Sequence, residues 1–197
     1  MMNRLVLFAP LVLFGLGGIF LFAQLMRHGA PGTFEDNLIP ELIGFCLEGF
    51  FLVGIFSLIQ LRLARERKNE LRLSLRGALR EVLSHLDVAL LEEFTEPATS
   101  AALEQDPRAV QALFVKLSNR QLELEDMRNL KKTAGVSFSI LRDLIPVAAN
   151  LSADHMRWWL AIADSVREIA EATSSIGVTT AAQRFLINVG EFDDLRL

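Results

Sequence analysis

Two long apolar stretches at the start of the chain constrain its fold most strongly. The first, from Leu5 to Met26, carries no charged side chain, and the second runs from about Leu38 to Leu61. A helix needs roughly 20 apolar residues to cross the hydrocarbon core of a bilayer. We therefore predict a transmembrane hairpin over residues 1–61, with helices at about 5–26 and 38–61 joined by a loop that contains Gly and Pro. A cleaved signal peptide is the alternative for the first stretch, but its apolar run exceeds the usual length of about 7–15 residues.

Basic residues indicate which way this hairpin faces. Many of them follow the second stretch, including Arg62, Arg65, Arg67, Lys68 and Arg72. Because Lys and Arg stay on the cytoplasmic side of a membrane, we expect both termini in the cytoplasm and the connecting loop outside. The same five residues are expected to set this topology and to contact anionic lipid headgroups. The general character of the chain, rather than any targeting signal, favours a bacterial inner membrane.

Two carboxyl side chains interrupt the second apolar stretch. Glu48 lies about ten residues, roughly 15 Å, into the predicted helix and hence close to mid-bilayer, and Glu41 lies on nearly the same face. A charged group at that depth costs at least about 2.5 kcal/mol and by default marks a functional site. Two interpretations stay open: hydrogen bonding between subunits, or the lining of a water-filled path. Both predict self-association, because two helices alone barely hide a carboxyl group from lipid.

The remainder of the chain has the pattern of a helical bundle. Apolar residues spaced by three and four predict a juxtamembrane basic amphipathic helix over 62–94, whose apolar stripe either packs in a core or pairs with other copies as a stalk. A linker follows at 95–107, a helical bundle at 108–190 and a frayed tail at 191–197. Asp106 is expected to cap the first bundle helix, and Pro146 to kink or end a later one. The predicted fold is all-α: a transmembrane hairpin followed by a cytoplasmic helical bundle.

No motif in the sequence names a reaction. The single cysteine, Cys46, excludes a disulfide within one chain and a cysteine-based zinc site. The net charge of −4 gives no reason to expect nucleic acid binding. We predict no catalytic residue, no metal and no cofactor, and the partner-binding candidates are Trp158, Trp159 and His155. The plainer interpretation places one tryptophan ring in the core and the other half-exposed, with the histidine at a surface or groove.

These patterns lead to two functional hypotheses. In the first, the chain is a non-enzymatic integral membrane protein whose cytoplasmic helical domain binds a partner protein or small ligand and signals that event to the membrane. In the second, the chain forms an oligomeric pore or ion pathway lined by Glu41 and Glu48. The expected partners are the lipid bilayer, further copies of the chain, and an unidentified cytoplasmic protein or small ligand.

Overall fold

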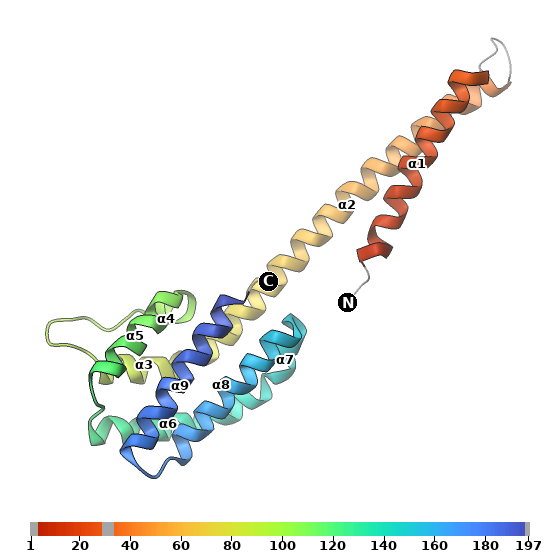
Figure 1. Cartoon of the computed structure of the whole chain (residues 1–197). Helices are drawn as coiled ribbons and strands as arrows, with labels where there is room; N and C mark the ends of the chain where they lie inside the picture. The colour runs from red at the N-terminus through yellow and green to blue at the C-terminus, as the bar shows by residue number, and fades with distance from the viewer. Residues whose placement is uncertain (1–3, 29–33, 196–197) are drawn as a thin grey trace. The chain divides into compact units, whose positions relative to one another are not determined.

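The computed structural model describes residues 4–28 and 34–195, which form α-helices joined by turns and short irregular segments (Figure 1). The predicted all-helical class is confirmed. The helices of these described residues are α1 (Arg4–His28), α2 (Phe34–Ala78), α3 (Arg80–Ala89), α4 (Ser100–Gln105), α5 (Pro107–Asn119), α6 (Leu124–Asp143), α7 (Ile145–Leu151), α8 (Ala153–Glu171) and α9 (Ser175–Asp194). The chain divides into two compact units, Met1–Glu66 and Arg67–Leu197, and α2 contributes residues to both. The turn expected between the two apolar stretches includes residues 29–33, which lie outside the described residues.

The first unit is a pair of helices, α1 and the first part of α2, that contact each other through small residues. A Cβ atom added at Gly49 would lie 2.7 Å from the ring of Phe14, and one added at Gly18 would lie 3.4 Å from Cys46. The Phe14 ring also meets Phe45 edge to face, with ring centroids 5.9 Å apart. Residues early in α1 contact residues late in this part of α2, so the two helices run antiparallel.

One helix among the described residues, α2 from Pro40 onward, is long and apolar enough to cross a membrane. The apolar part of α1, Ala9–Gln24, is shorter than such a span. The structure therefore shows the helical pair, with one member that meets the length and apolarity requirement for a span, and the described residues do not show a transmembrane hairpin.

The second unit is a bundle in which the last turns of α2 pack with α3 to α9. Neighbouring helices include α8 with α9, α6 with α8, α5 with α9 and α3 with α6. The apolar stripe predicted for 62–94, formed by Leu71, Leu75, Leu79, Val82 and Leu86, lies in or against this core. Its last four members are wholly buried, as are Leu83 and Leu90. These side chains are therefore unavailable to other copies, which confirms the core-packing interpretation of the stripe and contradicts the self-pairing stalk.

Several predicted boundaries are wrong. The single helix expected over 62–94 is two helices, because α2 ends at Ala78 and the N–H of Leu79 donates to the carbonyl of Arg76, 3.1 Å away, in a tight turn. This turn keeps the apolar stripe directed into the core. The expected linker at 95–107 contains the short helix α4, which Thr99 caps through the N–H of Ala102.

Other local signals are confirmed. The side chain of Asp106 accepts a hydrogen bond from the N–H of Arg108, 2.9 Å away, and caps α5. The helical stretch around Pro146 is interrupted: α6 ends at Asp143, and α7 continues after a bend of 52°. Proline is tolerated in the first turn of α7 because its missing N–H has no partner there in any helix.

The C-terminal tail differs most from expectation. Residues 191–197 were expected to fray, but α9 continues to Asp194, and residues 196 and 197 lie outside the described residues. The apolar spacing of Phe185 and Val189 continues to Phe192, and all three side chains are fully buried. Asp193, also in this last turn, is 8% exposed. Burial of this turn against the bundle supplies the stabilisation that a free helix end lacks.

Candidate functional site

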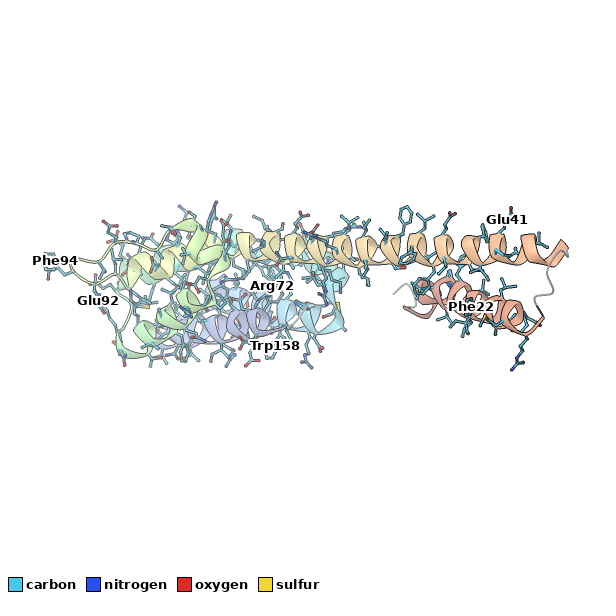
Figure 2. The ribbon with its side chains drawn as sticks, turned by 90° about the horizontal axis from the view of Figure 1, so that it is seen from above. Phe22, Glu41, Arg72, Glu92, Phe94 and Trp158 are labelled. Atoms are coloured by element: carbon cyan, nitrogen blue, oxygen red, sulfur yellow. The ribbon has the colours of Figure 1, made fainter. Side chains whose placement is uncertain are left out.

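The most unusual chemistry in the second unit is a buried ionic cluster formed by α2, α8 and α9. Arg76 of α2, 2% exposed, directs its Nε to Oδ1 of Asp193 on α9 at 3.0 Å. Arg72, one helical turn earlier and labelled in Figure 2, donates to the backbone carbonyl of Asp193 and lies 3.8 Å from the same Oδ1. His155 of α8 is 1% exposed and meets the Phe192 ring edge to face, with centroids 5.3 Å apart.

Helix geometry explains why these cations gather. Lys68, Arg72 and Arg76 are spaced by four residues and therefore share one face of α2. Lys68 uses this position to donate to the carbonyl of Leu151, the last residue of α7, at 3.1 Å. The three residues thus join α2 to α7 and α9 within the second unit. Of the five residues predicted to meet lipid headgroups, Lys68 and Arg72 are half-buried in these contacts.

Four buried polar atoms in this cluster have no hydrogen-bond partner among the described residues. They are Nη1 and Nη2 of Arg76, Oδ2 of Asp193 and Nε2 of His155. A buried polar group without a partner costs about 1–3 kcal/mol, and a charged one costs more. The cluster therefore contains buried polar groups whose loss of hydration is not fully offset, and removal of one charge of the Arg76–Asp193 pair would leave the other charge buried without a partner.

Burial also changes the proton affinities in the cluster. Burial lowers the pKa of Arg76 below its usual value, although Asp193 partly opposes the change. Burial raises the pKa of Asp193, although Arg76 and Arg72 pull it down. Burial lowers the pKa of His155 as well, and the nearby charges of Arg72 and Lys68 lower it further, so this imidazole is neutral at pH 7.

The contact between Ser152 and His155 is a helix cap rather than an activated nucleophile. Ser152 Oγ lies 2.8 Å from Nδ1 of His155 and accepts the His155 backbone N–H at 3.2 Å, which begins α8. A nucleophile and base need a third group that orients the base, and His155 Nε2 has no such partner among the described residues. The sequence favoured a surface position for His155, and the structure buries it.

The two tryptophans take the places expected from the plainer interpretation. Trp159 is fully buried, and its Nε1 donates to the carbonyl of Leu141 at 2.8 Å. Trp158 is half-buried, with the Arg157 guanidinium 5.7 Å from its ring centroid. Of the three partner-binding candidates, Trp158 alone keeps accessible surface.

The remaining predicted site residues lie in or near the apolar part of α2. Glu41 and Glu48 are both exposed on its surface, and Figure 2 shows Glu41 directed away from α1. Arg62 and Arg65 are exposed too, and Arg62 pairs with Glu66 at 2.9 Å. Arg67 is exposed at the start of the second unit.

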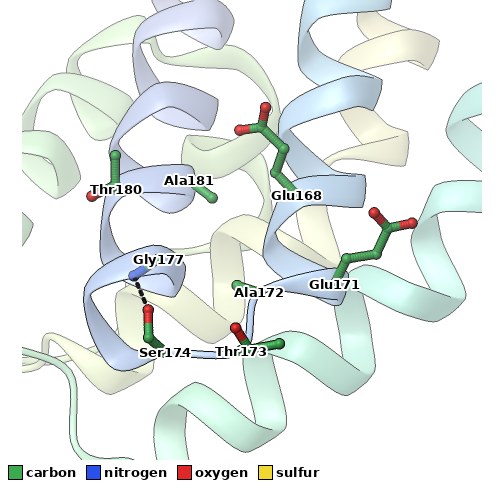
Figure 3. A pocket seen from close by; sticks show the side chains of 8 residues that line it. All are labelled: Glu168, Glu171, Ala172, Thr173, Ser174, Gly177, Thr180 and Ala181. Atoms are coloured by element: carbon green, nitrogen blue, oxygen red, sulfur yellow. Dashed lines mark hydrogen bonds between the residues drawn. The ribbon is translucent and has the colours of Figure 1, made fainter.

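A shallow pocket lies where α8 passes into α9 (Figure 3), with a volume of about 460 Å³. Ser174 caps α9 there by accepting the N–H of Gly177 at 3.1 Å, and Glu168 pairs with Arg184 at 2.8 Å. These interactions account for Ser174 and Glu168, two of the polar side chains that line the pocket. Within the part of the chain that the structure describes, no group of three or more His, Cys, Asp or Glu side chains is placed to hold a metal ion.

Sequence reasoning missed the central pair of the ionic cluster. Arg76 appeared only as one more basic residue after the apolar stretch, and Asp193 fell in the tail that was expected to fray. A signal was present for Asp193, because Phe192 lies three residues after Val189 and extends the apolar face of the last helix. Comparisons of the chain with protein-family models, with curated proteins and with solved structures found no match.

Proposed function

We propose that this chain is a non-enzymatic integral membrane protein that holds a helical bundle at the cytoplasmic face of a membrane, where the bundle binds a partner protein or small ligand. In this proposal α1 and α2 form a two-span hairpin with both termini in the cytoplasm. A bacterial inner membrane is the expected setting. The long helix α2 joins the lipid-embedded part to the bundle.

The exposure of α2 is the observation that carries the proposal. A core helix of a soluble protein is apolar but mostly buried, whereas only 6% of the most apolar window of α2 is buried. Large side chains such as Phe51, Phe56 and Leu58 are more than half exposed there. Soluble proteins rarely expose contiguous apolar surface on this scale. Lipid is the environment in which such a surface is stable.

Orientation in this proposal rests on charge. Arg62 and Arg65 are exposed directly after the apolar part of α2, and Arg62 also pairs with Glu66. Lys68 and Arg72 are committed to contacts within the bundle, so they stabilise the second unit as well as adding positive charge on that side.

Alkaline extraction of membranes tests the anchoring. The full-length chain should remain in the membrane pellet after washing with carbonate at high pH and should be released by detergent. Recovery of the chain in the carbonate supernatant would overturn the proposal. A matched variant carrying Phe51→Lys and Leu52→Lys should leave the pellet or fail to accumulate, because each Lys near mid-bilayer costs about 2.5–3.5 kcal/mol.

Partner binding in this proposal is assigned to the surface around Trp158. Aromatic residues are favoured anchors of interfaces, and this ring retains exposed area beside Arg157. Trp158→Ala in the full-length protein should weaken binding of its cytoplasmic partner, whereas Val136→Ala on α6 should not. Equal binding by both variants would remove Trp158 from the proposal.

An ion pathway is the second candidate function, and the exposure of both Glu41 and Glu48 favours it. Under this hypothesis, liposomes that contain the full-length protein conduct ions, and Glu48→Gln alters that flux. Absence of flux from the wild-type protein, with and without cytoplasmic partners, would rule the pathway out.

A further inference from the structure

The two faces of the apolar part of α2 have different environments. One face packs against α1 through Cys46, Gly49 and Phe50. A helix turns by 100° per residue, so the opposite face carries Glu41, Glu48, Leu52, Ile55 and Ile59. Phe45 lies at the edge of this face, where its ring also meets Phe14 of α1. We call these six residues the outer seam. All six are exposed; for example, Phe45 is 64% exposed and Leu52 57% exposed.

The spacing of the outer seam is that of a helix-pairing surface. Its members follow one another at intervals of four, three, four, three and four residues. This alternation is the heptad spacing with which two helices pack along a common seam. The α1-facing side of α2 instead carries Gly49 and Gly54, which suit close contact inside the hairpin.

Glu48 requires a polar partner that the hairpin does not supply. The side chain lies on the face opposite α1, and the apolar part of α1, Ala9–Gln24, has Gln24 at its very end as its one Asn, Gln or charged residue. Hydrocarbon offers no hydrogen bond to a carboxyl group. A polar group within another helix at the same depth is the partner that the chemistry calls for.

A second copy of the chain supplies a polar side chain at this depth, because it carries its own Glu48. Copies inserted with the same orientation bring their α2 helices together in parallel, so each position meets its own counterpart across a two-fold axis. Glu48 then faces Glu48 of the other copy at the same depth, and two carboxyl groups can hydrogen-bond through a shared proton. Phe45, Leu52 and Ile55 would pack above and below this contact.

We propose that the outer seam is a homodimer interface in which two parallel α2 helices pair across Glu48. The interface rests on the proposed membrane insertion and adds to it the partner, the face and the register. A different membrane protein seated on the seam is the competing occupant, and the test below distinguishes the two.

Disulfide trapping in native membranes tests the interface. Because Cys46 is the single cysteine, Cys46→Ser gives a cysteine-free chain in which one new cysteine reports one position. Leu52→Cys places the thiol on the seam, and Leu58→Cys places it on an equally lipid-exposed side, with parent side chains 57% and 69% exposed. After mild oxidation, Leu52→Cys should form at least about ten times more covalent dimer than Leu58→Cys, because a disulfide requires Cβ atoms about 3.5–4.5 Å apart.

Changes at Glu48 test the polar contact within the Leu52→Cys chain. Glu48→Gln keeps a hydrogen-bonding side chain, so its yield of cross-linked dimer should stay within about twofold of that of the chain that retains Glu48. Glu48→Ala should lower it by about three- to thirtyfold, the range expected for loss of one interhelical hydrogen bond in a membrane. A loss in both variants, or in neither, would overturn the pairing across Glu48.

Two further results would separate failure of the homodimer from failure of the membrane proposal. Equal dimer yields at Leu52 and Leu58, or cross-links from Leu52 to another protein alone, would overturn the homodimer while the chain still resists carbonate extraction. Release of the chain by carbonate would instead overturn the membrane proposal on which the interface rests, so the two failures are distinguishable.

Discussion

Removal of Asp193 from the buried ion pair is expected to destabilise the second unit strongly. Asp193→Leu keeps the number and branching of the side-chain heavy atoms but leaves the guanidinium of Arg76, whose side chain is 3% exposed, without its anion. Arg does not lose its proton in proteins, and breaking a buried ion pair from one side costs about 3–5 kcal/mol. For a unit of this size, the Tm should fall by about 10–15 °C, at roughly 3 °C per kcal/mol.

Removal of Arg76 should lower the stability of the second unit less at low pH, because Asp193 can then bind a proton and become neutral. Burial already raises the pKa of Asp193 above its usual value. A carboxyl group with a raised pKa in the folded state contributes stability at low pH that is lost as the pH rises through that pKa. The deficit of Arg76→Met relative to wild type should therefore be small near pH 4 and grow toward pH 8. The double variant Arg76→Met/Asp193→Leu has no buried charge in the pair. Its stability should equal that of wild type or exceed it by as much as about 1–4 kcal/mol.

Tryptophan fluorescence of the full-length protein in detergent isolates the relevant transition. The chain has two Trp and no Tyr, and both Trp158 and Trp159 lie on α8, so the signal reports the second unit. The reasoning would be refuted if the double variant melted as low as Asp193→Leu. It would also be refuted if the deficit of Arg76→Met did not depend on pH.

Three other parts of the second unit give separate tests. A fragment of residues 67–197 should show a cooperative melt by circular dichroism, whereas 92–197 should stay unfolded, because it lacks six buried side chains between Leu75 and Leu90 worth roughly 1.5–3 kcal/mol each. Phe94, 97% exposed and marked in Figure 2, has a φ of 72°, so Phe94→Gly should raise stability by about 1 kcal/mol; a Tm no higher than that of Phe94→Ala would contradict this. Burial lowers the pKa of His155, so the unfolded chain binds a proton first and stability is lost as the pH falls below about 6.5. From pH 7.5 to pH 5 the wild type should lose more Tm than His155→Gln, and parallel losses would show that His155 does not titrate in this way.

Local signals in the sequence predicted the fold class and several helix ends. The caps at Asp106 and Ser152 depend on hydrogen bonds between neighbours in the chain, so they are readable from the sequence. The break at Leu79 was not readable, because Gly77 is weak evidence and the turn is stabilised by tertiary burial of the residues around it.

The candidate sites also differ in whether they can be recognised from the sequence or only from the tertiary structure. Glu48 stands out in the sequence because a carboxyl group in an apolar stretch is rare whatever the fold. The Arg76–Asp193 pair joins residues that are distant in the chain, and neither belongs to a motif. Only the packing of α9 against α2 brings them together, so the pair appears once the tertiary structure is known.

The membrane position of α2 is the central claim, and labelling of single cysteines from outside intact cells tests it most directly. In the Cys46→Ser background, Arg27→Cys lies at the end of α1 beside the expected outer loop, and Gln121→Cys lies on the exposed surface of the bundle. A membrane-impermeant maleimide should modify Arg27→Cys in intact cells and Gln121→Cys only after the membrane is opened. Labelling of Gln121→Cys in intact cells, or of neither site until the cells are broken, would contradict a hairpin that places the bundle in the cytoplasm.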